Sequence, residues 1–252
     1  MIEILFTILI FCFGLAVGSF LNVVIIRGHK GEKLGGRSHC VRCGSILSVQ
    51  ELIPVFSFFV QKRRCRHCTR SISWQYPLVE LACAFAYLGV FLLAAPSVFV
   101  QIGLALGIPA ALVILVSDLR FQTIPDGATL ILTILGLGAV ISRSVYAYDS
   151  MAALLIAGIL GGLWFFSHGQ WMGFGDVKLI FATSLILGFP AAIAAFLFAF
   201  WSGGTVGALL LLTGKKHLRE RIPFGPFILL GSVLAWFFSS LFFNRTGLGI
   251  LV

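Results

Sequence analysis

The residues best placed to do chemistry are two aspartates at the ends of apolar segments. Asp118 ends the apolar run 112–117, and Asp176 opens another run directly after Gly173-Phe174-Gly175. Two carboxyl groups a few ångströms apart in a poorly hydrated site do not both ionise, so one keeps its proton. The ionised group can activate water while the protonated group donates to a carbonyl oxygen. We therefore predict that Asp118 and Asp176 form a catalytic pair.

Each acid near this pair also has a structural alternative. Asp176 alone could be the N-cap of the helix that follows it. Asp118 alone could form an ion pair with Arg120 or Lys178, and Asp126, after Ile124-Pro125, is expected to cap the next helix or to line the site. The residues predicted to line a substrate site are Gly173, Phe174, Gly175 and Asp126.

The other acidic residues divide into two groups. Glu51 and Glu80 are weak candidates for a second, cofactor-binding site, and they could equally be paired structural acids. The remaining four lie in terminal or polar segments, where we expect solvated surface positions; they are Glu3, Glu32, Asp149 and Glu220.

Four cysteines form two CxxC pairs in the single long hydrophilic segment. Cys40 and Cys43 make the first pair, and Cys65 and Cys68 make the second. Four thiolates at this spacing are typical of a structural zinc site, in which metal ligation replaces a core too small to fold alone. Disulfides and an iron–sulfur cluster are the alternatives. We predict zinc because a cytoplasmic location keeps thiols reduced.

The elements that must position these residues are membrane helices. The chain is 59% hydrophobic and only 11% charged, whereas soluble domains have about 25% charged residues. Repeated apolar runs predict an all-α polytopic membrane protein of about eight helices. The expected helices cover 4–26, 76–94, 97–116, 127–142, 151–167, 177–187, 191–212 and 224–243. We expect three parts: a first transmembrane helix within 1–26, a cytoplasmic zinc-binding loop at 27–75, and a catalytic helix bundle at 76–252.

Basic residues predict the orientation. With the N-terminus outside, the predicted inner loops hold sixteen lysines and arginines, and the outer segments hold only Arg143 and Arg245. Such an excess marks the cytoplasmic side. It places the cysteine loop, Asp118, Asp126 and Asp176 on that side, and it makes nucleic acid an unlikely explanation of the net charge of +9.

In these residues the chain resembles the type IV prepilin peptidases, including those of type II secretion and competence systems. The motifs that carry the resemblance run in the family's order over nearly the whole chain. They are Gly18-Ser-Phe-Leu-Asn-Val-Val24, both cysteine pairs, Glu51-Leu-Ile-Pro54, Tyr76-Pro-Leu-Val-Glu-Leu81, Ser117-Asp-Leu-Arg-Phe-Gln-Thr-Ile-Pro-Asp126, Gly173-Phe-Gly-Asp-Val-Lys178 and Ile222-Pro-Phe-Gly-Pro226.

The resemblance implies a bifunctional enzyme of the bacterial inner membrane. Such an enzyme cleaves the basic leader of prepilin-like proteins at the cytoplasmic face and then methylates the new N-terminal amine with S-adenosylmethionine. Carried over by position, the catalytic aspartates are Asp118 and Asp176. The resemblance also implies zinc in the cysteine loop, with a link to methyl transfer. The implied partners are prepilin-like substrates and membrane lipid, and a homo-oligomer is allowed.

Two other functions fit part of the sequence. A peptidase without methyltransferase activity would use the same aspartates. A proton- or cation-coupled transporter would use them as ion-binding groups along a pathway. Transport predicts polar residues through the whole bilayer, yet the outer halves of the predicted helices are nearly all apolar. Hydrolysis at one membrane face is therefore the leading hypothesis.

Overall fold

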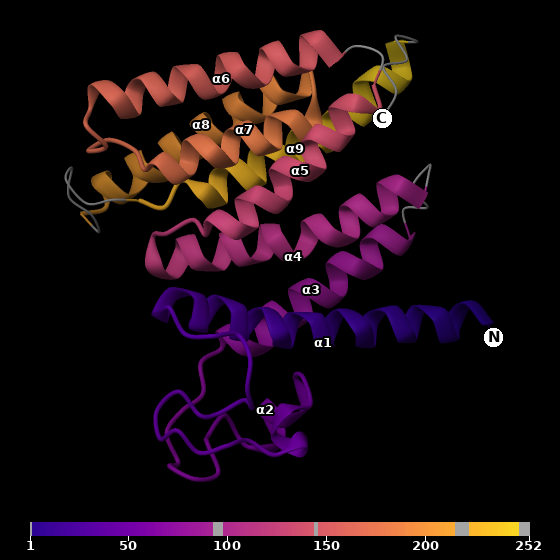
Figure 1. The fold of residues 1–252 in the computed structure, drawn as a ribbon, viewed down its shortest axis with the longest axis vertical. Helices are drawn as coiled ribbons and strands as arrows, with labels where there is room; N and C mark the ends of the chain where they lie inside the picture. The colour runs from indigo at the N-terminus through magenta and orange to yellow at the C-terminus, as the bar shows by residue number, and fades with distance from the viewer. Residues whose placement is uncertain (1, 93–97, 144–145, 215–221, 247–252) are drawn as a thin grey trace. The chain divides into compact units, whose positions relative to one another are not determined.

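The computed structural model is helical, and it describes residues 2–92, 98–143, 146–214 and 222–246 (Figure 1). Among these residues there are eight longer helices, and the loop between the first two of them contains two short helical elements. The elements are α1 (Ile2–Lys30), the 3₁₀ helix η1 (Val49–Leu52), α2 (Phe56–Val60), α3 (Gln75–Leu92), α4 (Val98–Phe121), α5 (Asp126–Ile141), α6 (Tyr146–Phe166), α7 (Phe174–Leu187), α8 (Ala191–Leu212) and α9 (Gly225–Thr246). Glu220 and the neighbouring basic residues at 215–221 lie outside the described residues.

Five helices in the described part of the chain are long and apolar enough to cross a membrane. They are Glu3–Lys30, Gln75–Leu92, Gln101–Phe121, Tyr146–Phe166 and Ala191–Leu212. Two shorter apolar helices, Asp126–Ile141 and Gly225–Phe238, accompany them. The all-helical prediction is therefore confirmed, while the count of eight spans stays a prediction.

Several predicted helix boundaries were wrong: α1 continues past residue 26 to Lys30, α4 continues past residue 116 to Phe121, α7 begins at Phe174 and not at 177, and α6 begins before residue 151. The run 143–150 was expected to be a polar connection before a helix at 151, but α6 begins at Tyr146. The first turn of α6 contains Asp149, which is buried instead of solvated. The polar sequence of this run therefore reflects a buried interaction and not a solvent-exposed loop.

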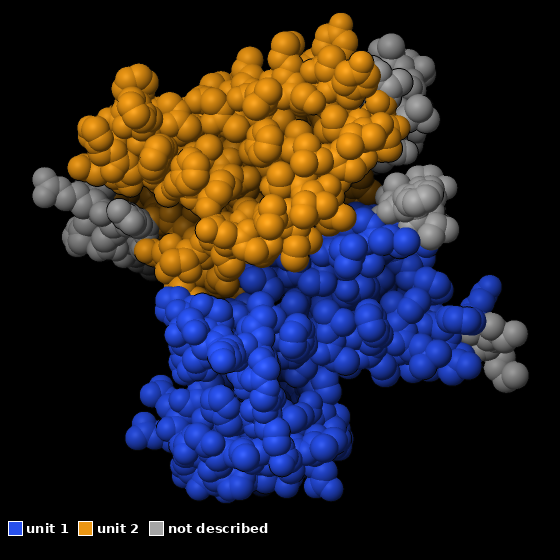
Figure 2. All heavy atoms as spheres, viewed as in Figure 1, with its two compact units in different colours: residues 1–113 blue, residues 114–252 orange. Residues whose placement is uncertain are grey.

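The chain forms two compact units, residues 1–113 and 114–252 (Figure 2). These units are defined by which residues pack together. The predicted functional parts, 1–26, 27–75 and 76–252, have different boundaries and stay a prediction. In the first unit, α1 packs against α3. A Cβ on Gly14 or Gly18 would lie 2.5 or 2.6 Å from the α3 backbone, so these small residues allow the close helix contact typical of membrane proteins.

Asn22 adds polar bonds to the contact between α1 and α3. Its amide nitrogen donates to the Tyr76 carbonyl at 3.2 Å, and its oxygen accepts from the Gln75 side chain at 3.1 Å. Hydrogen bonds of this kind between membrane helices contribute about 0.6–2 kcal/mol. They hold the end of α1 beside the start of α3.

The second unit is built around α7, which packs against α5, α6, α8 and α9 (Figure 1). Most residues of α7 between Asp176 and Leu185 are buried. A helix that is apolar on all sides is stable only when it is surrounded. This central position places both ends of α7 in contact with other helices of the unit, and both ends carry polar networks.

Candidate active site

Asp118 lies in the last turn of α4 and its side chain points into the second unit. It is 5% exposed, and its Oδ2 atom accepts a hydrogen bond of 2.8 Å from the backbone N–H of Gly225. Gly225 is the first residue of α9. The first amides of a helix have no partner within the helix, so the carboxyl group meets a donor that needs an acceptor. This bond joins residues that are 107 positions apart.

Asp176 lies in the first turn of α7 and is also buried. It was considered as an N-cap residue, but Gly173 occupies that position and Asp176 is the third residue of the helix. Its Oδ2 atom accepts a hydrogen bond of 3.2 Å from the Gly173 N–H. Asp176 therefore caps the helix from its third position, by accepting from the N-cap amide, and this bond orients the carboxyl group.

Ile124 connects the surroundings of the two aspartates. A Cβ on Gly175 would lie 2.9 Å from the Ile124 Cβ, and a Cβ on Gly225 would lie 3.4 Å from the Ile124 Cδ1. The same Cβ on Gly225 would lie only 2.7 Å from Asp118 Oδ2. The fold thus brings the two predicted catalytic acids into one apolar surrounding within the second unit.

Asp126 lies outside this surrounding. It is the first residue of α5, and its side chain is 81% exposed. It forms an ion pair with Lys178, whose ammonium group also lies 5.4 Å from the centre of the Phe174 ring. The alternative in which Lys178 pairs with Asp118 was therefore wrong. Phe174 in turn packs on Trp164, with ring centres 4.9 Å apart.

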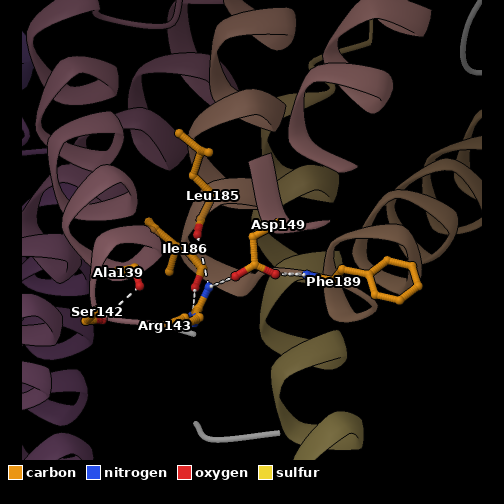
Figure 3. A network of polar contacts seen from close by, with 7 residues as sticks. All are labelled: Ala139, Ser142, Arg143, Asp149, Leu185, Ile186 and Phe189. Carbon is orange, nitrogen blue, oxygen red and sulfur yellow. Dashed lines mark hydrogen bonds and ion pairs between the residues drawn. The ribbon is translucent and has the colours of Figure 1, made fainter. Parts of the chain in front are cut away.

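A second polar network lies at the other end of α7 (Figure 3). Asp149 is 1% exposed; its Oδ2 atom is 3.3 Å from an Arg143 guanidinium nitrogen, and its Oδ1 atom accepts from the Phe189 N–H at 2.8 Å. Arg143 also donates to the carbonyl oxygens of Leu185 and Ile186. These carbonyls belong to the last turn of α7, where no helical donor remains and a cation is favourable.

Gly188 is required by this second network. Its φ angle is +72°, in the region that favours glycine. A Cβ at this position would lie 2.6 Å from Arg143 Nη1 and 2.8 Å from Asp149 Oδ1. The turn after α7 therefore depends on a residue without a side chain. The expectation that Asp149 is a solvated surface residue was wrong, because Asp149 is buried and bonded to the partly buried Arg143 and to the Phe189 amide.

The four cysteines of the loop come together in the first unit. Their sulfur atoms all lie within 4.8 Å of one another, and Cys40 Sγ and Cys68 Sγ are 4.0 Å apart. Tetrahedral zinc–thiolate ligation at about 2.3 Å places sulfur atoms about 3.8 Å apart. Hydrogen bonds with Ser45 lower the pKa of the Cys43 thiol to about 6, whereas for Cys68 a backbone hydrogen bond with Arg70 is outweighed by desolvation and the other three thiols, which raise its pKa to about 11. A metal ion binds the thiolate form of each. The donor set and spacing therefore fit a metal ion.

The two cysteine pairs have the same local geometry. In the first, the Gly44 N–H donates to the Cys40 carbonyl at 2.9 Å; in the second, the Thr69 N–H donates to the Cys65 carbonyl at 2.9 Å. Gly44 and Thr69 both have positive φ angles, +74° and +57°. Each pair is thus a tight turn that presents two sulfur atoms on one side, as in a zinc knuckle.

Glu51 is the buried acid of this loop with an unsatisfied oxygen. Hydrogen bonds of 2.9 Å from the Ser48 amide and hydroxyl reach its Oε2 atom and lower the pKa of the carboxyl group. Its Oε1 atom is buried and has no hydrogen-bond partner in the described part of the chain. The Nε2 atom of His67 lies 3.9 Å from this oxygen.

Glu80 has a different role in the same unit. It is 5% exposed, lies five residues inside α3, and its Oε2 atom accepts from the Val55 N–H at 2.7 Å. It therefore ties the loop to a membrane helix. Of the two weak candidates for a cofactor site, Glu51 retains an unsatisfied oxygen, whereas Glu80 is engaged in this structural bond.

Sequence reasoning missed three contributors to these sites. Gly225 was noticed only as part of a motif, and Ile124 was not assigned a role. Arg143 was counted only as an outer charge. The sequence does indicate a role for Gly225, because a residue at the start of a helix has a free amide that can bind an acid. No sequence signal identifies the acid that it meets.

Comparison with known proteins covers most of the chain. The family model described as "Bacterial Peptidase A24 N-terminal domain" matches residues 12–94, and the one described as "Type IV leader peptidase family" matches residues 105–209. No solved structure matches the chain.

Three curated relatives illustrate the match, and each has the name "Prepilin leader peptidase/N-methyltransferase". The Bacillus subtilis (strain 168) protein is 34% identical over 238 residues, covering 91% of this chain and 93% of the relative. The Burkholderia pseudomallei (strain 1026b) protein is 33% identical over 273 residues, covering 93% and 86%. The Myxococcus xanthus (strain DK1622) protein is 34% identical over 232 residues, covering 86% and 67%. With the apolar helices, this similarity identifies a multi-pass membrane protein.

Proposed function

This chain belongs to the type IV leader peptidase family, and we propose that it cleaves the leader of prepilin-like proteins by an aspartic mechanism and then N-methylates the new N-terminus. The observation that carries the peptidase part is the joint burial of Asp118 and Asp176 in one apolar surrounding. Neighbouring carboxyl groups in such a site share a proton. One then activates water and the other donates to the peptide carbonyl oxygen.

Backbone amides support this assignment by orienting both acids. The Gly225 N–H binds Oδ2 of Asp118, and the Gly173 N–H binds Oδ2 of Asp176. Each bond restrains one carboxyl group without supplying a full positive charge. A neighbouring cation would favour ionisation of both acids, whereas the proposed reaction needs one acid in each protonation state.

For the substrate, we propose that Gly173, Phe174 and Gly175 line the approach to the pair, with Asp126 at its edge. Gly173 and Phe174 are exposed at the start of α7, and Ile124 fills the space beside Gly175. Asp126 and Lys178 form an exposed ion pair beside the start of α7. An exposed rim around buried acids suits a peptide that binds from the membrane edge.

We further propose that Cys40, Cys43, Cys65 and Cys68 hold one structural zinc ion. The close sulfur cluster and the two matching turns support it. When bound, the ion would cross-link the two turns and stabilise the loop. Replacing Cys40 and Cys43 with Ser should reduce the metal content of the purified protein, measured by elemental analysis. Unchanged zinc content would contradict the assignment.

The methyl donor would be S-adenosylmethionine, in keeping with the names of the relatives. Glu51 is our preferred contact for it because its Oε1 atom is buried and unsatisfied. A carboxylate oxygen suits an ammonium group of the donor. Glu80 remains the second candidate.

The proposed membrane arrangement follows the basic residues. The N-terminus is outside, the active site faces the cytoplasm, and the eight longer helices span the inner membrane, with 1–26 as the first span, 27–75 as the zinc-binding loop and 76–252 as the catalytic bundle. The ten Lys and Arg residues between 27 and 74 support this orientation. The apolar helices would contact lipid in this arrangement, and a homo-oligomer is compatible with it.

The decisive experiment incubates the purified enzyme with a prepilin peptide and labelled S-adenosylmethionine. Mass spectrometry reports cleavage and the addition of one methyl group as separate events. Asp118→Asn and Asp176→Asn should each lower the cleavage rate by at least about 10³-fold. Both variants should insert and fold, because asparagine keeps an oxygen that can accept the backbone amide bond.

Glu32→Gln is the matched control, since it removes a carboxylate that is exposed, paired with Lys30 and outside the proposed site. Cleavage at the wild-type rate by Asp118→Asn or Asp176→Asn would refute the pair mechanism. Cleavage without methyl addition would leave a peptidase alone. Substrate-independent proton or cation flux in liposomes, with no cleavage, would favour the transporter hypothesis.

A further inference from the structure

The short helix α2 has a strongly apolar outer face. Phe58 points inward and is 6% exposed, whereas Phe56, Phe59 and Val60 are 62%, 58% and 51% exposed. Trp74, which is 50% exposed, lies against it, with its ring centre 5.0 Å from that of Phe58 and 6.3 Å from that of Phe59. We call Phe56, Phe59, Val60 and Trp74 the α2 face. An exposed cluster of large apolar residues usually marks an interaction surface.

Trp74 places this face near the level at which the chain enters a membrane. It directly precedes α3, whose residues Gln75–Leu92 are long and apolar enough to span. Tryptophan is enriched at the interface between water and lipid, where its ring is buried and its N–H stays hydrated. Because Trp74 contacts the α2 aromatic rings, α2 lies at the same end of α3.

Glu80 fixes the depth of α2 more closely. The Val55 N–H, at the residue before α2, donates to Glu80 Oε2 at 2.7 Å. Glu80 is five residues inside α3, which is about 7.5 Å along the helix axis. The beginning of α2 therefore lies beside the first turns of a membrane helix and not beyond its end. Val55 has a φ angle of +60°, a strained conformation for a β-branched residue that the bond to Glu80 helps to hold.

The exposed charge next to this face is positive, because the two flanking acids, Glu51 and Glu80, are buried. Between residues 52 and 79 the chain has five lysines and arginines and no acidic residue. All five are exposed, and three of them, Lys62, Arg63 and Arg64, follow directly after Gln61, the C-cap of α2. Aromatic residues combined with adjacent cations are typical of segments that lie in the headgroup region of anionic membranes.

We propose that the α2 face is seated in the headgroup region of the cytoplasmic leaflet, with Lys62, Arg63 and Arg64 bound to anionic phospholipid. A membrane fits better than a protein partner because Glu80 holds α2 beside a span and because the cations match anionic lipid. This inference deepens the proposed function by naming the lipid contact of the cysteine loop. It rests on the proposed topology and is independent of the catalytic pair.

The test uses the full-length enzyme in nanodiscs and a photoreactive residue. Phe59→p-benzoylphenylalanine is compared with the same replacement at Val41, a residue of the first cysteine pair that is 48% exposed. In discs that contain phosphatidylglycerol, the yield of lipid adducts at position 59 should be at least about fivefold higher than at position 41. Discs of phosphatidylcholine alone should lower the yield at position 59, and so should Lys62→Gln combined with Arg63→Gln and Arg64→Gln.

The outcomes are distinguishable from those of the catalytic test. Equal lipid yields at positions 59 and 41 would overturn the proposal. Adducts to an added prepilin peptide in place of lipid would overturn it in favour of a protein-docking surface. Equal lipid-adduct yields at position 59 with and without phosphatidylglycerol would overturn the proposed binding of anionic phospholipid. Asp118→Asn combined with the probe at 59 should keep the lipid adducts while losing cleavage, so failure of either idea leaves the other standing.

Discussion

The two ends of α7 each bring a buried aspartate site to the same helix, but the sites differ in their partners. At the N-terminal end, Asp176 and nearby Asp118 accept bonds from backbone amides. At the C-terminal end, Asp149 meets the guanidinium group of Arg143 as well as the Phe189 amide. All three acids are less than a tenth exposed, so burial alone does not distinguish them.

The difference teaches that the neighbouring charge decides what a buried acid can do. Arg143 forms an ion pair with Asp149 and donates to the last carbonyls of α7, which makes that end structural. Two acids near one another, each held by a neutral amide, can exchange a proton, which makes the other end suitable for catalysis. The comparison predicts opposite consequences for substitutions at the two ends.

The largest expected effect on stability is at the structural end. Asp149→Ala should lower the free energy of unfolding by about 3–5 kcal/mol, because it leaves the partly buried guanidinium group of Arg143 without its counter-ion and the Phe189 amide without its acceptor. Thermal unfolding of the purified protein in nanodiscs measures the change. The double variant Arg143→Met with Asp149→Leu should recover part of the loss. An Asp149→Ala protein as stable as the wild type would remove the distinction between the two ends.

Gly225→Ala should act on the catalytic end without removing a polar group. The amide that binds Asp118 is kept, but the new Cβ would lie 2.7 Å from the Asp118 Oδ2 atom and must displace it. A displacement of about 1 Å can lower kcat about 10²-fold. Gly127→Ala, in the first turn of α5, is the control because nothing lies within 4 Å of its Cβ. Equal cleavage rates for the two variants would show that Asp118 does not depend on this contact.

Gly188→Ala should produce a smaller loss at the structural end. The substitution strains a residue with φ of +72° and crowds Arg143 and Asp149, so we expect about 1–3 kcal/mol of destabilisation. Gly138→Ala is the control, since its Cβ has open space within α5 and alanine favours the helix. The melting temperatures of the two variants should move in opposite directions; a shared upward shift would contradict the proposed crowding.

The smallest effect is expected at the exposed ion pair beside the catalytic end. Asp126→Asn breaks the pair with Lys178, and exposed pairs contribute only about 0–1 kcal/mol. Melting temperature and cleavage rate should therefore stay close to wild-type values. A loss comparable to that of Asp118→Asn would move Asp126 from the rim of the site into the catalytic machinery.

Much of this molecule could be predicted from local patterns. Apolar runs predicted the helices, because an uninterrupted apolar segment of sufficient length has few alternatives in a membrane. The spacing of the cysteine pairs predicted a cluster that the structure confirms as four close sulfur atoms. Asp118 and Asp176 were selected because they stand at the ends of apolar segments, and their burial agrees with that choice.

The choice of partners was decided by tertiary structure alone. Lys178 pairs with Asp126 and not with Asp118, and Asp118 meets an amide 107 residues away. Asp149 has a polar local sequence that suggested a surface position, yet Arg143 and the turn at Gly188 bury it. Periodicity and segment length report which residues face water or lipid, because those properties are local. Which charge meets which donor depends on how distant helices pack, and only the folded chain sets that.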